Sequence, residues 1–366
     1  MSGERRRRPI SASTWPAEIS FLRELVAIPS VSGNEELAAA LVESRARQLG
    51  LDVVRDETSV RVSSGDEASG RTLALASHLD VVPPGDGWTR DPFAPVIEDG
   101  LLYGRGSGDA KASVSSMLHA LADVAAHGGP QRGRLLAIFS YAEETRNATM
   151  PEAVKRAGRL DAAIVGEPTN LQFAVAQRGL MMVDLIAHGV QRHAGYAEPG
   201  AANAVTSLAE DLLRLEGIVS ERVHPLLGVT TVTPTMLEAG VSRNVTPASA
   251  KAVLDVRSTP AWTHDELESA LRERLSSEVI VTSKRLVPCE TPGASALLKA
   301  AQAAAPDAAS YGSPTCSDWC FLRHLDAIKV GPGTSRRSHT PDEAVDLGEV
   351  TAARAFYARV AERYLT

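Results

Sequence analysis

Residues 73–111 have the sequence LALASHLDVVPPGDGWTRDPFAPVIEDGLLYGRGSGDAK, and this stretch decides the fold. It begins inside an apolar, β-prone run, residues 72–77, which leads to His78 and Asp80. A loop rich in proline and glycine follows, then a hairpin signal and alternating glycines that lead to Asp109. A buried strand that stops on an imidazole and a carboxylate presents both at its carboxyl end, where open α/β sheets place their chemistry.

A His-x-Asp pair alone is weak support for a functional site. Residues i and i+2 share a face of a strand, so a histidine held by a neighbouring carboxylate is the ordinary interpretation. Three further apolar runs, however, end in the same way. They are residues 134–142 before Glu143 and Glu144, residues 161–165 before Glu167, and residues 327–330 before His339. Solvated charges explain one such run better than four, and imidazoles with carboxylates favour a hydrolytic zinc, cobalt or manganese site.

Composition limits the classes of protein that this chain can represent. Its 366 residues, 44% of them hydrophobic, can form two domains with a sizeable core. The net charge of −7 argues against nucleic acid as the main partner. Three irregularly spaced cysteines form neither a disulfide framework nor a zinc knuckle, and no signal or membrane segment is visible. We therefore predict a cytoplasmic protein without membrane attachment, in which Arg5 to Arg8 form a solvated basic arm.

Periodicity divides the chain into two regions. Apolar residues at helical spacing predict a helix over residues 110–127. After Glu167 the predicted order becomes strand, helix, strand, strand, helix, strand. These elements span residues 180–187, 201–215, 229–237, 251–257, 264–275 and 279–282. That order is the ferredoxin-like arrangement, so we expect an inserted domain over residues 177–284 within an α/β domain made of residues 1–176 and 285–366.

The motifs carry a family resemblance. HLDVVPPGDGW, DPF, GLLYGRGSGDAK, AEE, GEPT and GPGTSRRSHTPDE, in this order, resemble the two-zinc family of acetylornithine deacetylase, succinyl-diaminopimelate desuccinylase and carboxypeptidase G. The segments GEPTNLQFAVAQRGLM, AHGVQRHAGYAEPGAANA and GSPTCSDW are most similar to the short acetylornithine-deacetylase-like branch. The resemblance covers nearly the whole chain after its first dozen residues. It implies a zinc-peptidase-like catalytic domain whose inserted ferredoxin-like domain serves as a dimerisation and lid module.

The resemblance also implies a ligand set. Two Zn²⁺ ions per chain, replaceable by Co²⁺, would be held by His78 and Glu167 on one ion and by Glu144 and His339 on the other. Asp109 would bridge the two ions. Each ion would then have three protein ligands and an open position, which is typical of a catalytic site.

Further roles follow from the same resemblance. Asp80 would fix the imidazole tautomer of His78, and Glu143 would act as general base and acid. His193 would donate to the reacting oxygen from the partner subunit of a homodimer. The candidates for binding the substrate are Asn244 and Arg257 for its carboxylate, Arg243 as a weaker choice, and Thr315 in a substrate-side loop.

The expected reaction is hydrolysis of the amide of a small N-acyl amino acid, with N2-acetylornithine of arginine biosynthesis as the first candidate substrate. Acetylcitrulline, acetyl-lysine, succinylornithine and succinyl-diaminopimelate remain alternatives, as does a dipeptide or carboxypeptidase substrate. A serine hydrolase is disfavoured because no G-x-S-x-G elbow occurs. A nucleotide-binding protein is disfavoured because Asp109 stands where the third glycine of G-x-G-x-x-G should be. A non-catalytic binding protein on the same scaffold would be expected to have lost a metal ligand or the catalytic base. All six of these positions are intact in this sequence.

Overall fold

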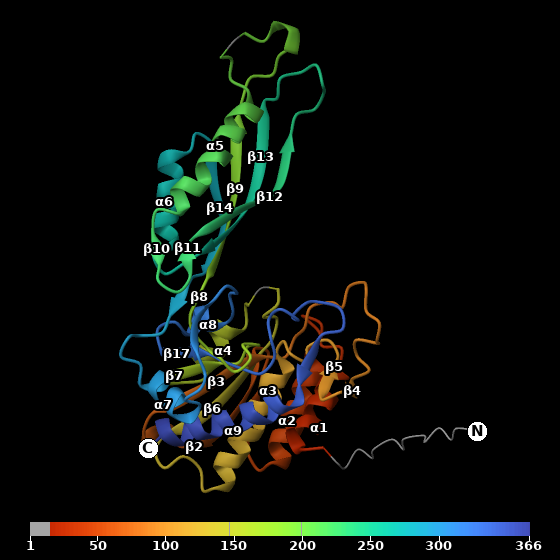
Figure 1. Ribbon diagram of the computed structural model, residues 1–366, viewed down its shortest axis with the longest axis vertical. Coiled ribbons are helices and arrows are strands. Elements are labelled where there is room, and N and C mark those ends of the chain that lie inside the picture. Colours follow the sequence, from red (N-terminus) through yellow and green to blue (C-terminus); the bar gives the residue numbers. More distant parts are fainter. Residues whose placement is uncertain (1–14, 146, 199) are drawn as a thin grey trace, which may run out of the picture. The chain divides into compact units, whose positions relative to one another are not determined.

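The computed structural model describes residues 15–145, 147–198 and 200–366, so the predicted basic arm lies outside the described residues. The chain divides into two compact units (Figure 1). The first contains the residues up to 173 together with 293–309 and 324–366, and the second contains 174–292 and 310–323. The second unit is longer than the predicted insertion of residues 177–284 and includes a later segment. The reason is strand pairing, because β16 (Ser310–Ser313) pairs with β8 (Phe173–Gln177).

A sheet with a parallel centre forms the middle of the first unit. Within this unit its strands follow the order β1-β2-β6-β3-β7-β17, in which β6, β3, β7 and β17 are parallel, and β8 continues the sheet beyond β17. All seven residues of β3 are buried, as expected for a strand covered on both faces. The bounds are β1 Asp52–Arg55, β2 Ser59–Gly65, β3 Thr72–His78, β6 Arg134–Ser140, β7 Ala162–Val165 and β17 Asp326–Lys329.

Helices cover this sheet and bring distant segments together. Helices α1, α3 and α9 pack against one another, and Ile19, Leu22, Ala112 and Val350 share one core cluster. The bounds are α1 Ala17–Val26, α2 Glu36–Gln48, η1 Glu67–Ser69, α3 Lys111–Ala126, α4 Met150–Arg156, α7 Ala296–Ala304 and α9 Leu347–Tyr364. Because α3 begins at Lys111, Asp109 stands just before its first turn.

A small three-stranded sheet, β18-β5-β4, supports the loop before α3. Its bounds are β4 Val96–Glu98, β5 Leu101–Tyr103 and β18 Ala344–Asp346. The predicted hairpin joins β4 to β5 through Asp99 and Gly100, whose φ angles of 48° and 81° fit the left-handed turn that this dipeptide favours. The sheet therefore fixes where the glycine loop, residues 104–108, begins.

The second unit has the predicted ferredoxin-like arrangement. Its antiparallel sheet has the order β12-β13-β9-β14, and α5 and α6 pack on it (Figure 1). Burial alternates along β9, and Val183, Leu208, Leu254 and Leu271 meet in the core between sheet and helices. The bounds are β9 Gly179–His188, η2 Ala194–Tyr196, α5 Ala204–Val219, β10 Val223–His224, β11 Gly228–Val229, β12 Thr231–Ala239, β13 Ser249–Ser258, α6 His264–Arg274, β14 Glu278–Leu286, β15 Cys289–Glu290 and α8 Trp319–Leu322.

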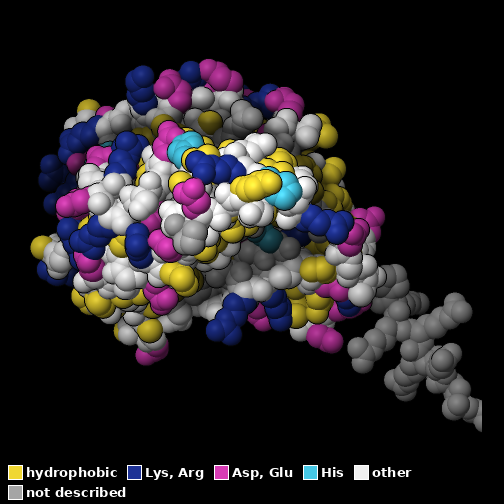
Figure 2. Space-filling model, turned by 90° about the horizontal axis from the view of Figure 1, so that it is seen from above, with side chains coloured by type: hydrophobic (Ala, Val, Ile, Leu, Met, Phe, Trp, Pro, Cys, Tyr) yellow, Lys and Arg dark blue, Asp and Glu magenta, His cyan; other side chains and the backbone are white. Residues whose placement is uncertain are grey.

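The described part of the chain contains no helix that is both long and apolar enough to cross a membrane. Basic and acidic side chains are interspersed on the face shown in Figure 2.

Candidate metal centre

The carboxyl ends of neighbouring parallel strands deliver the predicted donors to one edge of the first unit. His78 is the last residue of β3. Glu144 follows the end of β6, and Glu167 follows the end of β7. His339 stands in the loop after β17, and Asp109 precedes α3. Segments far apart in the sequence therefore meet at this edge because the sheet orders their strands side by side.

The two carboxylate oxygens of Asp109 face different imidazoles. Asp109 Oδ1 lies 3.4 Å from His78 Nε2, and Asp109 Oδ2 lies 3.7 Å from His339 Nε2. Glu167 Oε1 is 3.9 Å from His78 Nε2, on the first side. Glu144 Oε1 is 3.0 Å from His339 Nε2, on the second side. The residues thus form two groups that share Asp109.

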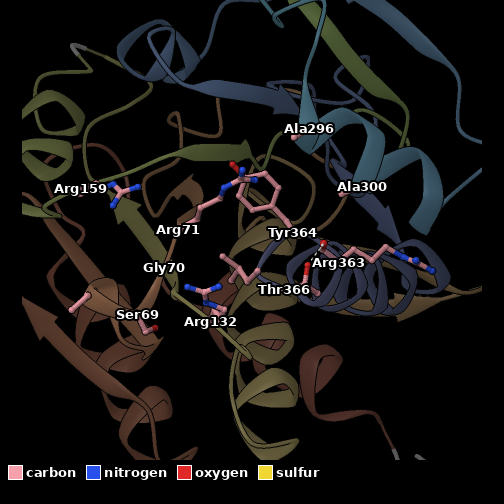
Figure 3. A pocket seen from close by; sticks show the side chains of 12 residues that line it. Ser69, Gly70, Arg71, Arg132, Arg159, Ala296, Ala300, Arg363, Tyr364 and Thr366 are labelled. Carbon is pink, nitrogen blue, oxygen red and sulfur yellow. Dashed lines mark hydrogen bonds between the residues drawn. The ribbon is translucent and has the colours of Figure 1, made fainter.

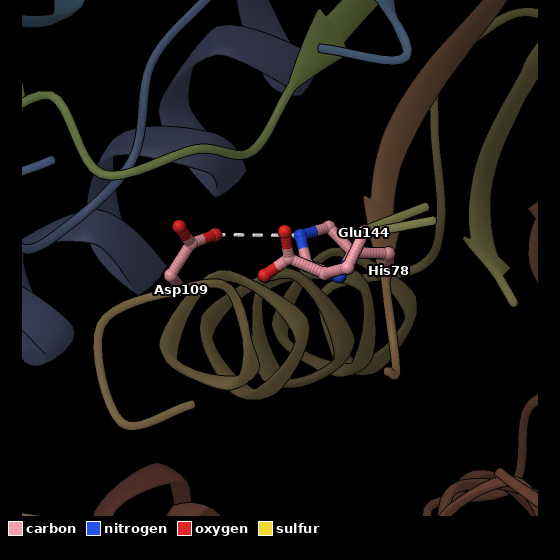
Figure 4. A group of neighbouring side chains, drawn as sticks. All are labelled: His78, Asp109 and Glu144. Carbon is pink, nitrogen blue, oxygen red and sulfur yellow. Dashed lines mark ion pairs between the residues drawn. The ribbon is translucent and has the colours of Figure 1, made fainter. Parts of the chain in front are cut away.

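Glu144 also lies close to the first group. His78, Asp109 and Glu144 each offer one ligand atom, and these three atoms lie within 4.8 Å of one another. This spacing could hold a metal ion (Figure 4). Figure 4 shows the three side chains pointing toward one another above the start of α3. The donor set fits divalent metal, because imidazole nitrogen and carboxylate oxygen without thiolate is the chemistry of hydrolytic metal sites.

The tautomer of His78 is fixed by its surroundings. Its Nδ1 lies 3.0 Å from the backbone carbonyl oxygen of Asp80 and 3.4 Å from Asp80 Oδ1. A carbonyl oxygen can only accept, so Nδ1 carries the hydrogen. The Nε2 lone pair of the neutral ring is therefore left for a metal ion.

Asp80 organises more than the imidazole. Its side chain is fully buried and accepts hydrogen bonds from Ser32 Oγ at 2.7 Å and from the backbone N–H groups of Glu143 and Glu144 at 3.0 Å each. The two glutamates follow Ala142, whose φ angle is 52°. His339 has a φ angle of 63°. Left-handed backbone at residues other than glycine is uncommon and clusters at functional sites, where surrounding contacts maintain it.

The carboxylates are crowded enough to shift their own titration. Burial, followed by the negative charge of Asp109, raises the pKa of Glu167 to about 8 and raises the pKa of Glu144. Burial alone would lower the pKa of His78, but hydrogen bonds with Asp109 and Asp80 outweigh it and raise that pKa well above its ordinary value. The hydrogen bond with Glu144 raises the pKa of His339. This excess of buried negative charge is what bound cations would neutralise.

Several supporting residues were missed by sequence reasoning, although they stand inside the quoted motifs. The buried carboxylate of Glu343 accepts from the backbone N–H groups of residues 106, 108 and 109, at 2.9 to 3.1 Å, and from Arg105 Nη1 at 2.7 Å. Lys111 is buried and donates to the carbonyl oxygens of Leu25 and Ile28. Spacing gave no signal for either role, because their partners are distant in sequence.

The other predicted residues belong to the second unit and form two groups at opposite ends of β13. His193 is exposed and pairs with Val245 across a β-bridge, so it neighbours Asn244, which precedes β13. Arg257 lies near the other end of β13 and is about 26 Å along the strand from Ser249. Within one chain, Asn244 and Arg257 therefore do not converge on one carboxylate.

The remaining two candidates are also in this unit. Arg243 is exposed on the loop before β13. Thr315 follows β16, where its hydroxyl group lies 3.1 Å from Ser313 Oγ. Arg178 joins this region to Arg257, because it donates to the Arg257 carbonyl oxygen while its own N–H donates to the Ser313 carbonyl oxygen. Arg257 and Thr315 are thus connected at one end of the unit.

Comparison with known proteins gives this geometry its context. The profile of Peptidase family M20/M25/M40 matches residues 74–363. The chain belongs to this family. Succinyl-diaminopimelate desuccinylase 2 of Ruegeria sp. is 30% identical over 379 residues, with 94% of each chain covered. Succinyl-diaminopimelate desuccinylase of Methylorubrum populi is 30% identical over 391 residues, with 95% and 98% covered.

Solved structures of family M20 proteins share the fold. Aminopeptidase PepT of Bacillus cereus superposes with a TM-score of 0.79 at 17% identity, covering 95% of this chain and 98% of that one. The YXEP protein of Bacillus subtilis, described as a dinuclear metal-binding peptidase, gives 0.70 at 15% identity and covers 94% and 96%. The predicted family and fold class are therefore confirmed, and the protein is a metal-dependent amidohydrolase of family M20.

Proposed function

We propose that this enzyme hydrolyses the amide bond of a small N-acyl amino acid at a two-metal centre. The observation that supports this proposal most is that the two carboxylate oxygens of Asp109 face different imidazoles. Oδ1 faces His78 and Oδ2 faces His339. A carboxylate placed in this way is positioned to bridge two ions. His78 with Glu167, and His339 with Glu144, would complete the ligand set. Zinc is the metal we propose, with cobalt able to replace it.

The metal ions, when bound, would polarise the amide carbonyl and lower the pKa of a water molecule. Glu143 is the side chain we assign to proton transfer. Its Oε1 accepts a hydrogen bond from Asn147 Nδ2 at 2.8 Å, and its backbone is held by Asp80. It adjoins Glu144 in the turn that follows β6. Glu143 would take the proton of the attacking water and pass it to the leaving amine.

We infer that a second subunit completes the site. His193 and Asn244 lie together at one end of the second unit, whereas Arg257 and Thr315 are connected at the other. A single carboxylate cannot meet Asn244 and Arg257 of the same chain. In a homodimer formed through this unit, the His193 group of one subunit would serve the centre of its partner. Under this proposal the second unit is the dimerisation and lid module, and the first is catalytic.

Two acylated diamino acids are candidate substrates. The motifs of the chain favour N2-acetylornithine, and so does the pairing of Arg257, whose guanidinium donates to both oxygens of Asp255 at 2.8 and 3.0 Å. An arginine already matched by a carboxylate suits a substrate with little negative charge. The relatives named as desuccinylases favour N-succinyl-diaminopimelate, which carries more carboxylates. In the described part of the chain Cys289, Cys316 and Cys320 form no disulfide, which agrees with the proposed reaction in the cytoplasm.

The decisive experiment measures kcat/KM for acetylornithine, succinyl-diaminopimelate, acetylcitrulline, acetyl-lysine and succinylornithine with zinc-loaded protein. Dialysis against chelator should abolish hydrolysis, and Zn²⁺ or Co²⁺ should restore it. Asp109→Ala should lose both ions together, because the bridge serves both. A metal-free protein with undiminished activity would overturn the proposal, and a preference for succinyl-diaminopimelate would replace acetylornithine as the substrate.

A further inference from the structure

A cavity of about 590 Å³ opens at the amino ends of the parallel strands of the first unit (Figure 3). Arg71 stands immediately before β3, Arg132 just before β6, and Arg159 just before β7. The cavity is also lined by Ala296 of α7 and by Tyr364 at the end of α9. We call it the arginine cavity, because Arg71, Arg132, Arg159 and Arg363 all line it.

The arginine cavity is separate from the metal centre. His78 ends β3 at one edge of the sheet, and Arg71 precedes the same strand at the other edge. Seven residues at about 3.3 Å each put the two ends roughly 20 Å apart. A ligand in the cavity therefore touches none of the residues assigned to hydrolysis.

The charge of the lining is one-sided. Four arginines line the cavity and no aspartate or glutamate side chain does, although the chain has 45 acidic residues against 38 basic ones. Arg159 pairs with Asp161 at 2.7 Å. In the part of the chain that the structure describes, Arg71, Arg132 and Arg363 have no carboxylate side chain within 4.0 Å. The α-carboxyl group of Thr366, which also lines the cavity, offsets one of these charges at most.

Three of the four guanidinium groups, those of Arg71, Arg132 and Arg159, are arranged around a shared space (Figure 3). Arg71 lies over the ring of Tyr364, 5.4 Å from its centroid, which restrains its planar fork. Arg71, Arg132 and Arg159 lie around the space, whereas the guanidinium group of Arg363 points away from these three (Figure 3). Guanidinium forks bind carboxylate and phosphate groups through paired hydrogen bonds. Exposed cations that line one space repel one another, and Asp161, which pairs with Arg159 and also attracts Arg71, offsets only part of their charge. A multivalent anion would relieve the remaining repulsion.

We propose that the arginine cavity binds a small molecule with two or more anionic groups, either phosphate esters or carboxylates. Its volume falls in the range of about 300 to 1,000 Å³ that is typical of small-ligand pockets. An extended polyanion such as nucleic acid is disfavoured, because the chain carries a net charge of −7 and the basic groups are gathered in a cavity rather than along a surface.

The test is calorimetric titration of the full-length, metal-loaded protein at fixed ionic strength. Fructose 1,6-bisphosphate probes the phosphate chemistry and tricarballylate the carboxylate chemistry; both bind divalent metal weakly, so the metal centre is left intact. Inorganic phosphate and a twelve-nucleotide single strand serve as the monovalent-site and extended-polyanion comparisons. We expect saturable binding of one of the first two probes, at least tenfold tighter than that of inorganic phosphate.

Variants locate the binding. Arg71→Gln with Arg132→Gln should weaken it at least tenfold, and Arg132→Gln alone should weaken it measurably if the double variant fails to fold. Arg359→Gln is the matched control, because Arg359 is exposed on α9 and does not line the cavity. Saturable binding that is equal in all variants, or no saturable binding of either probe, would overturn the proposal. Tighter binding of the oligonucleotide would replace the small ligand with an extended polyanion.

Discussion

The backbone N–H of Glu143 donates a hydrogen bond to Asp80 Oδ1 at 3.0 Å, so a residue after β3 fixes the residue that we assign as the base after β6. The other oxygen of the same carboxylate holds the N–H of Glu144 at 3.0 Å, and Oδ1 lies 3.4 Å from His78 Nδ1. One buried carboxylate therefore sets the positions of the proposed base and of two proposed metal ligands relative to one another.

Asp80→Asn should lower metal affinity by about 10- to 100-fold and activity at least as much. The amide keeps one acceptor oxygen but turns an NH₂ group toward a backbone N–H, which leaves that donor unpaired. Metal titration followed by activity at saturating metal separates the two effects. Asp86→Asn, in an exposed loop, is the control. Unchanged metal affinity in Asp80→Asn would show that the carboxylate does not position the ligands.

Glu143→Gln and Glu144→Gln should behave differently although the residues are adjacent. We expect Glu143→Gln to keep two ions per chain and to lose about 10²- to 10⁴-fold in kcat, as for loss of a general base. Glu144→Gln should retain less metal, because its Oε1 is 3.0 Å from His339 Nε2. Elemental analysis beside turnover distinguishes the variants, and the reverse result would exchange the two roles.

Metal binding at pH 7 should release protons. In the metal-free chain burial raises the pKa of Glu167 to about 8, so the Glu167 carboxyl group is mostly protonated at pH 7. Between pH 4.5 and about 8, Glu167 binds more protons in the folded metal-free chain than in the unfolded chain, so the contribution of this group to stability falls as pH rises. A metal ion needs the deprotonated ligands. Calorimetry in buffers of different ionisation enthalpy should find fewer protons released at pH 9 than at pH 7; an unchanged number would contradict this assignment.

Glu343→Gln should destabilise the first unit by about 3 kcal/mol or more, because it breaks a buried ion pair with Arg105 and weakens the acceptor for the glycine loop. Metal affinity should fall as well, since Asp109 loses its backbone anchor. Urea unfolding of the metal-free protein measures the first effect without the second. Glu362→Gln, exposed on α9, should leave both unchanged. An unchanged free energy of unfolding in Glu343→Gln would show that the glycine loop does not depend on this carboxylate.

His193→Ala should lower kcat by about 10²- to 10³-fold while metal content stays the same, as for loss of a donor to a developing oxyanion. Mixing inactive His193→Ala with inactive Glu143→Gln under subunit exchange should regenerate sites that carry both natural residues, because His193 would act on the partner's centre. Light scattering at assay concentration checks the dimer. Confirmed heterodimers without activity, or an active monomer, would contradict action across subunits.

Local sequence determined the core strands and most of the proposed ligands. Buried parallel strands appear as continuous apolar runs, so β3, β6 and β7 were located almost to the residue. The donors directly follow these runs, and parallel strands bring their carboxyl ends to one edge. Strand pattern and residue type were therefore enough to predict that histidines and carboxylates meet at this edge, and the family resemblance singled out His78, Glu144 and Glu167 among them.

Tertiary structure alone decided what depends on contacts between distant segments. Glu343 supports the loop at Asp109 through packing of β18 on β5, and Asn244 is separated from Arg257 by the length of β13. The arginine cavity exists because parallel strands also bring their amino ends together, next to the end of α9. Periodicity records which face of an element is buried, but it does not record which element covers that face. That choice depends on side-chain packing and strand pairing across the whole chain.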